Sequence, residues 1–131
     1  MVIDTSALVA ILLREPDAQR YAAALENASV RLLSAVNRVE LSLVMEGRKG
    51  DAVRQDVDAL IRDGDIEIVA VTPSHAVLAI EAFRRFGKGR HRAGLNIGDC
   101  FSYALARATG DALLFKGDDF PHTDVEPALP P

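Results

Sequence analysis

Short apolar segments alternate with longer amphipathic ones along the whole chain. Strand-like apolar segments are predicted at residues 2–3, 30–33, 66–71 and 112–115, with a further short strand near Val125. The spacing of apolar residues predicts helices over residues 7–13, 18–28, 35–49, 51–63, 73–86 and 96–109. This alternation predicts an α/β fold with a mostly parallel central sheet and helices on both of its faces.

Helix start and stop signals support these boundaries. Thr72 precedes Pro73, a pairing typical of an N-cap followed by proline in the first helical turn. Ser34 and Asn96 are further N-cap candidates, and Gly50 follows the predicted end of the third helix.

The chain has 131 residues, 49% of them hydrophobic, and a net charge of −4, so we expect one folded domain over residues 1–131. No apolar run reaches the roughly 18 residues needed to span a bilayer, and no signal peptide precedes the domain, so we expect a cytoplasmic protein with no membrane partner.

Cys100 is the single cysteine and excludes an internal disulfide. The sequence around Cys100 favours a buried structural residue of a helix, and a catalytic thiol is the alternative.

Two carboxylates stand out in the first half of the chain. Asp4 directly follows the first strand and precedes Thr5 and Ser6, so it either caps the helix or belongs to a site at the sheet edge. Glu40 lies in the middle of a helix, on the same predicted face as apolar neighbours one turn away. No lysine or arginine shares that face, which favours a functional role for Glu40 over an ion pair.

The other candidate acids lie in the second half. Asp99 is in the first turn of its helix, three residues after Asn96, which is consistent both with a capping box and with a site for a cation. Asp118 and Asp119 follow the last clear strand, where an acidic turn is the alternative to a site.

Carboxylates from strand ends and helix starts can meet at one edge of a parallel sheet. There they repel one another, and a divalent cation would relieve the repulsion. All-oxygen ligands favour Mg²⁺, with Mn²⁺ as a substitute, over Zn²⁺. Such a site suits phosphodiester hydrolysis.

A basic segment at residues 84–92 suggests the substrate. Its Arg85, Lys88, Arg90, His91 and Arg92 are predicted to contact RNA, with His91 and the neighbouring Phe86 able to stack on bases. A solvated basic helix end is the alternative.

Residues 1–18, 39–48, 91–106 and 113–125 together resemble the PIN-domain ribonucleases, and most closely the VapC toxins of VapBC toxin–antitoxin modules. The resemblance implies a PIN-like fold in which Asp4, Glu40 and Asp99 are the first three catalytic acids. Gly117 stands where many relatives carry an acid or an amide, so Asp118 or Asp119 must be the fourth. Ser6 would support the site without binding the metal.

By the same resemblance, the chain is expected to be a Mg²⁺-dependent endoribonuclease toxin that cuts a structured tRNA or rRNA, with Asp4 and Asp99 as direct metal ligands. It implies a homodimer and a cognate VapB-type antitoxin, which can place an arginine among the carboxylates.

The main alternative function is that of a phospho-accepting receiver domain. That alternative lacks an acceptor aspartate, because the middle strands lead into Ser34 and Thr72.

Overall fold

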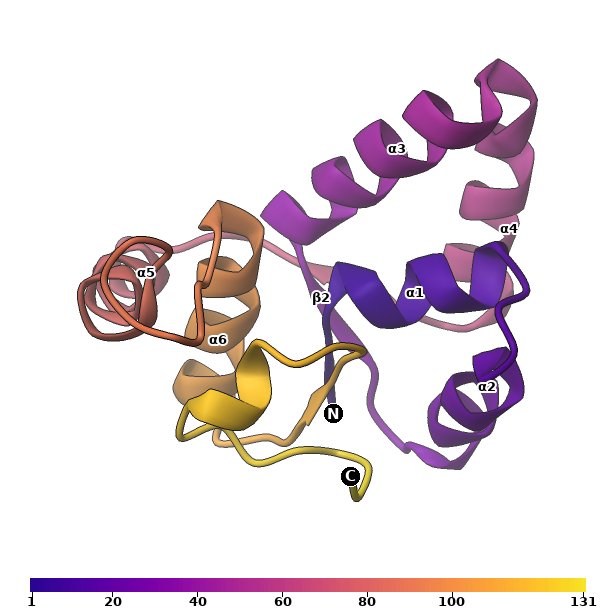
Figure 1. The fold of residues 1–131 in the computed structure, drawn as a ribbon. Coiled ribbons are helices and arrows are strands. Elements are labelled where there is room, and N and C mark those ends of the chain that lie inside the picture. The colour runs from indigo at the N-terminus through magenta and orange to yellow at the C-terminus, as the bar shows by residue number, and fades with distance from the viewer.

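The computed structural model describes residues 1–131 and places a four-stranded parallel sheet at the centre of the molecule (Figure 1). The strands are β1 (Val2–Ile3), β2 (Leu32–Ser34), β3 (Glu67–Val69) and β4 (Leu113–Leu114). Their order is β3-β2-β1-β4, with Val2 paired to both Leu32 and Leu113. The predicted fold class is confirmed, although every strand except β1 is shorter than its apolar segment.

Six α-helices surround the sheet: α1 (Thr5–Leu12), α2 (Ala18–Asn27), α3 (Ala35–Lys49), α4 (Arg54–Asp63), α5 (Pro73–Phe86) and α6 (Ile97–Thr109). The 3₁₀ helix η1 (Asp51–Val53) forms the start of the predicted fourth helix, and η2 (Phe120–His122) follows β4. The predicted strand near Val125 is wrong. The chain there makes only an isolated bridge, from Pro127 to Leu113.

The sheet separates two hydrophobic cores of similar size. Successive strand residues point to opposite faces. Val2, Leu32 and Leu113 therefore pack toward α5 and α6, whereas Ile3, Leu33 and Leu114 pack toward α1 to α4. Both faces of the sheet are apolar because both are covered, as is usual for a parallel sheet. No helix is long and apolar enough to cross a membrane.

The strand order creates a switch point beside β1. The chain moves outward from β1 to β2 and β3, and then returns to place β4 on the other side of β1. In open α/β sheets, ligands bind outside the carboxyl ends of the strands at such a point. Asp4 follows β1 and the turn at residues 117–119 follows β4, so both lie at this edge.

The orientation of α3 differs from the sequence prediction. Its fully buried residues are Asn37, Leu41 and Met45, whereas Leu43 is 70% exposed. Glu40 is only partly buried and Leu43, its apolar neighbour one turn away, is exposed, so the prediction that Glu40 shares a core-facing side with such neighbours is wrong for Leu43. Glu40 lies instead at the border of the buried face, next to Asn37.

Candidate functional site

Asp4 is held at the end of β1 by hydrogen bonds to both of its carboxylate oxygens. Oδ1 accepts from the Ser102 hydroxyl at 2.6 Å. Oδ2 accepts from the Ser6 hydroxyl at 2.6 Å and from the Ser6 backbone N–H at 3.0 Å. The bond from the Ser6 backbone N–H caps α1, so Asp4 is the N-cap of this helix. The Asp4 side chain is also buried, at 3% exposure.

Two serines fix this carboxylate from different elements. Ser6, predicted as a supporting residue, also accepts a hydrogen bond from the Lys116 backbone N–H at 3.0 Å, which joins the end of β1 to the end of β4. Ser102 on α6 is fully buried and was not predicted as a site residue. The one sequence feature that could have indicated a role for Ser102 is its hydroxyl, which lies among apolar residues of α6 one helical turn after Asp99.

Glu40 lies directly against the start of α6. A Cβ atom added to Gly98 would be 2.0 Å from Glu40 Oε2, so the glycine leaves the space that the carboxylate occupies. Glu40 Oε1 is 3.4 Å from the side-chain amide nitrogen of Asn37. Glu40 therefore sits next to Asp99 in space although 59 positions separate them in the sequence.

Asp99 forms the predicted capping box. Its Oδ2 accepts from the Asn96 backbone N–H at 3.0 Å, and Asn96 Oδ1 accepts from the Asp99 N–H at 2.9 Å. Burial, followed by the charge of Asp4, raises the pKa of Asp99 to about 7, and Asp119 and Glu40 add to the effect. The cap and the acid cluster thus use the same carboxylate.

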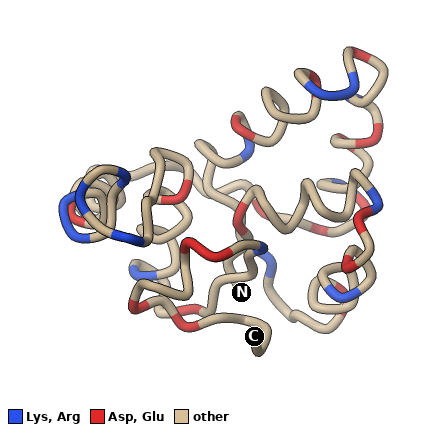
Figure 2. Tube along the Cα trace, viewed as in Figure 1, with Lys and Arg blue, Asp and Glu red and all other residues tan.

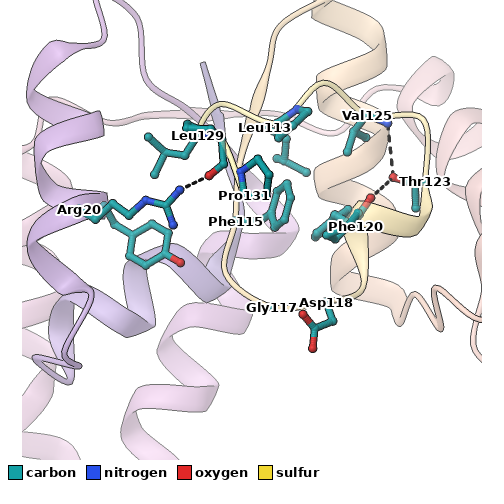
Figure 3. A pocket seen from close by; sticks show the side chains of 14 residues that line it. Arg20, Leu113, Phe115, Gly117, Asp118, Phe120, Thr123, Val125, Leu129 and Pro131 are labelled. Carbon is teal, nitrogen blue, oxygen red and sulfur yellow. Dashed lines mark hydrogen bonds between the residues drawn. The ribbon is translucent and has the colours of Figure 1, made fainter.

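The two acids after β4 are not equivalent. The charge of Asp119 is one of the main causes that raise the pKa of Asp99. Asp118 instead lines a cavity of about 440 Å³ beneath the C-terminal tail, together with residues such as Tyr21, Phe115 and Pro130 (Figure 3). Asp118 is the only predicted site residue in this cavity, so the cavity is separate from the cluster of Asp4, Glu40, Asp99 and Asp119.

None of the five predicted acids has a cationic partner. No salt bridge involves Asp4, Glu40, Asp99, Asp118 or Asp119, although Lys116 lies close by in sequence. The Lys116 ammonium pairs instead with Glu15 and Asp17. No three acidic, histidine or cysteine side chains are close enough to share one metal ion directly. A hard cation such as Mg²⁺ keeps several of its waters and binds through one or two carboxylates, so it does not require three ligands from the protein.

The basic loop of residues 87–92 follows α5 on the same side of the molecule as α6 (Figure 2). Lys88, Arg90 and Arg92 are exposed and make no salt bridge. Arg90 lies over the Phe83 ring, with its guanidinium carbon 5.4 Å from the ring centre. These three cations remain free to meet a phosphate backbone.

Two predicted RNA contacts have internal partners. Arg85 donates to Asp124 at 3.2 Å and to the Tyr103 hydroxyl at 3.3 Å, so it ties the C-terminal tail to α5 and α6. The Nδ1 atom of His91 accepts from the Ala93 backbone N–H at 3.0 Å. The prediction that Phe86 stacks on bases is wrong, because Phe86 is buried against His91 and Tyr103.

Cys100 is buried on α6, as predicted for a structural cysteine. Burial, with a smaller effect from Asp99, raises the pKa of its thiol to about 11. A thiol of this kind stays protonated near neutral pH and is a poor nucleophile.

Comparison with known proteins agrees with this arrangement. The family model of the PIN domain matches residues 1–126. The chain is 52% identical to the VapC ribonuclease Mb0640 of Mycobacterium bovis, over 95% of both chains. It is 50% identical to a ribonuclease VapC of Mycolicibacterium smegmatis, over 95% of this chain and 97% of the relative.

The fold is also that of a solved structure. The crystal structure of Mycobacterium tuberculosis VapC20, described as a sarcin-ricin loop cleaving toxin, superposes with a TM-score of 0.74 at 19% identity, over 96% of this chain and 98% of VapC20. These matches leave the receiver-domain alternative without support. With its parallel sheet and the acids gathered at the carboxyl edge of that sheet, the chain belongs to the PIN-domain family, among the VapC ribonucleases.

Proposed function

We propose that this protein is a Mg²⁺-dependent endoribonuclease that acts as the toxin of a VapBC module and cuts a structured RNA, either tRNA or rRNA. One observation carries the proposal. The carboxylates of Asp4, Glu40, Asp99 and Asp119 gather at the switch point of the sheet with no cation to balance them.

Asp4 and Asp99 are the proposed metal ligands. Ser6 and Ser102 fix the orientation of the Asp4 carboxylate, and the capping box fixes Asp99. Glu40 and Asp119 complete the cluster and accept hydrogen bonds from water at the reacting phosphate. We assign Asp119 rather than Asp118 as the fourth acid, because Asp119 contributes to the raised pKa of Asp99, whereas Asp118 lines the separate cavity beneath the tail.

The donor set suits Mg²⁺, with Mn²⁺ as a substitute. All candidate ligands are hard carboxylate oxygens, and the raised pKa of Asp99 reports a local excess of negative charge that a cation would neutralise. When bound, such an ion lowers the pKa of a coordinated water and neutralises charge that develops on the phosphoryl oxygens.

The exposed cations Lys88, Arg90 and Arg92 are proposed to bind the RNA backbone, since phosphate contacts supply most of the affinity in such complexes. Arg85 and His91 are proposed to contribute indirectly, by holding the loop and the end of α5. A structured target is supported by the name of the structural neighbour VapC20, which is a sarcin-ricin loop cleaving toxin.

The expected partners are a VapB-type antitoxin and a second copy of the chain. An antitoxin arginine among the four carboxylates would make bidentate, charge-assisted hydrogen bonds in place of the metal. The homodimer is proposed from the resemblance to VapC toxins, and exposed apolar side chains such as Leu43 on α3 or Val77 on α5, which are 70% and 64% exposed, are candidates for its interface.

The test is cleavage of end-labelled tRNA and rRNA fragments by the purified protein in Mg²⁺, Mn²⁺ or EDTA. We expect cleavage that EDTA abolishes and that Asp4→Ala and Asp99→Ala each reduce by several orders of magnitude. Asp56→Ala, which removes an exposed acid without an ion pair on α4, is the control and should cleave like the wild type. Cleavage that persists in EDTA would refute the role of the metal.

A further inference from the structure

We propose that Asn37 is a positioning residue for RNA cleavage: its side-chain amide holds the Glu40 carboxylate against the first turn of α6, beside Asp99. This inference rests on the proposed function of the acid cluster. It adds a residue that carries no charge and that the sequence analysis did not select.

The Asn37 side chain contacts α1 and α6 as well as Glu40 on its own helix, α3. Its Nδ2 atom lies 3.0 Å from the Gly98 carbonyl oxygen on α6, 3.3 Å from Thr5 Oγ1 on α1 and 3.4 Å from Glu40 Oε1 on α3. Thr5 also donates to the Asn37 backbone carbonyl at 3.4 Å. The side chain is fully buried, so water does not compete for these contacts.

The surroundings of the amide determine its orientation. Nδ2 faces three acceptors, whereas the opposite orientation would turn the oxygen Oδ1 toward a carboxylate and a carbonyl and would repel both. The favoured orientation leaves Oδ1 buried with no hydrogen-bond partner, the one such side-chain atom in the protein.

An unpartnered buried carbonyl destabilises a folded protein, because it loses its hydrogen bonds to water and gains none. An apolar side chain of similar volume would avoid this cost. Such a residue would, however, also remove the donor that Nδ2 offers to Thr5, Glu40 and Gly98. What asparagine adds is a donor for Glu40 and for the backbone of Gly98, which precedes Asp99.

Gly98 completes the arrangement from the other side. Because a Cβ atom at this position would be 2.0 Å from Glu40 Oε2, the carboxylate is confined between the Asn37 amide and the Gly98 backbone. Without the amide, Glu40 keeps its charge but loses the contact that fixes its direction. Residues that orient the groups around a metal ion in this way change metal affinity or activity by about 10- to 100-fold when they are replaced.

The experiment compares the wild type with Asn37→Leu, which removes the amide and approximates its volume, and with Asn37→Ala as a second variant. Three quantities are measured: unfolding in EDTA, Mn²⁺ binding without RNA by electron paramagnetic resonance, and cleavage of a labelled RNA. We expect Asn37→Leu to unfold in one cooperative transition like the wild type, so that it can be assayed in its folded state. We also expect it to bind Mn²⁺ about 10-fold more weakly and to show a kcat about 10- to 100-fold lower, with KM unchanged.

Two controls separate positioning from packing. Met45→Leu changes the buried face of the same helix about two turns away and should leave Mn²⁺ binding and kcat unchanged. In a Glu40→Gln background, Asn37→Leu should cause no further loss, because its effect acts through Glu40.

Wild-type Mn²⁺ affinity and kcat in both Asn37 variants would overturn the inference, as would a loss of cleavage that only follows a loss of folded protein. If the wild type itself binds no Mn²⁺ and cleaves no RNA, the proposed function fails, and this inference with it. The wild-type measurements therefore distinguish the two failures.

Discussion

Replacing Asp99 by asparagine should stabilise the metal-free protein. The substitution removes the negative charge and keeps an oxygen that can accept the capping hydrogen bond from the Asn96 N–H. A neutral side chain at this position does not repel Asp4, Glu40 or Asp119, and its burial costs less than that of a carboxylate.

The magnitude follows from the pKa of Asp99, which burial and then the charge of Asp4 raise from 3.8 to about 7. At about 1.4 kcal/mol for each tenfold change in the ionisation equilibrium, ionised Asp99 destabilises the fold by about 4 kcal/mol. The weaker cap of a neutral amide offsets about 0.5–2 kcal/mol of this amount. We therefore expect Asp99→Asn to be more stable than the wild type by about 2–4 kcal/mol at pH 8.

The ionisation of Asp99 makes the folding stability of the wild type fall as the pH rises. The folded-state pKa of Asp99 lies above its unfolded value, so between pH 4 and pH 7 the folded state binds more protons than the unfolded state. The wild type therefore loses stability relative to the variant as the pH rises through this window. The difference should be small or reversed at pH 4 and largest at pH 8.

The assay is urea unfolding in EDTA at pH 4, 6 and 8, at constant ionic strength, with Asp56→Asn as the exposed control. Mg²⁺ added at pH 8 should stabilise the wild type by mass action and the Asp99→Asn variant much less. The reasoning is refuted if Asp99→Asn is less stable than the wild type at pH 8, or if the difference does not change with pH. Either result would make Asp99 a helix cap only.

Three further predictions concern other parts of the molecule. Ser102→Ala should lower kcat about 10- to 100-fold in steady-state cleavage, because Asp4 Oδ1 loses the hydrogen bond that orients it; an unchanged kcat would make Ser102 a packing residue only. Replacing Arg90 and Arg92 together by alanine should reduce the slope of log K against log salt concentration by about 1 to 2 in filter-binding titrations, and an unaltered slope would place the loop outside the RNA path. Native Cys100 should resist iodoacetamide at pH 8 by mass spectrometry, since burial raises the pKa of its thiol to about 11, whereas urea-unfolded protein should react.

Local sequence signals determined much of the fold. Thr72 with Pro73 and Asn96 with Asp99 marked the starts of α5 and α6, because capping depends on hydrogen bonds between residues within three positions of each other. The alternation of apolar strands with amphipathic helices indicated the parallel sheet. The order and context of the acids were sufficient to place the chain in its family.

Tertiary structure decided how the acid cluster is built. Periodicity indicates that α3 has a buried face but leaves its rotation uncertain, and packing against α1 and α6 buried Asn37 with Leu41 and Met45. Packing also places Asp119 near Asp99 and Asp118 in the separate cavity, although the two acids are neighbours in the same turn and the sequence does not distinguish them. The contacts of Ser102 with Asp4 and of Gly98 with Glu40 join residues 98 and 58 positions apart, and no local pattern encodes such distances. The sequence alone thus determined which carboxylates are present and which elements carry them, whereas only packing between elements determined which neutral side chains hold them.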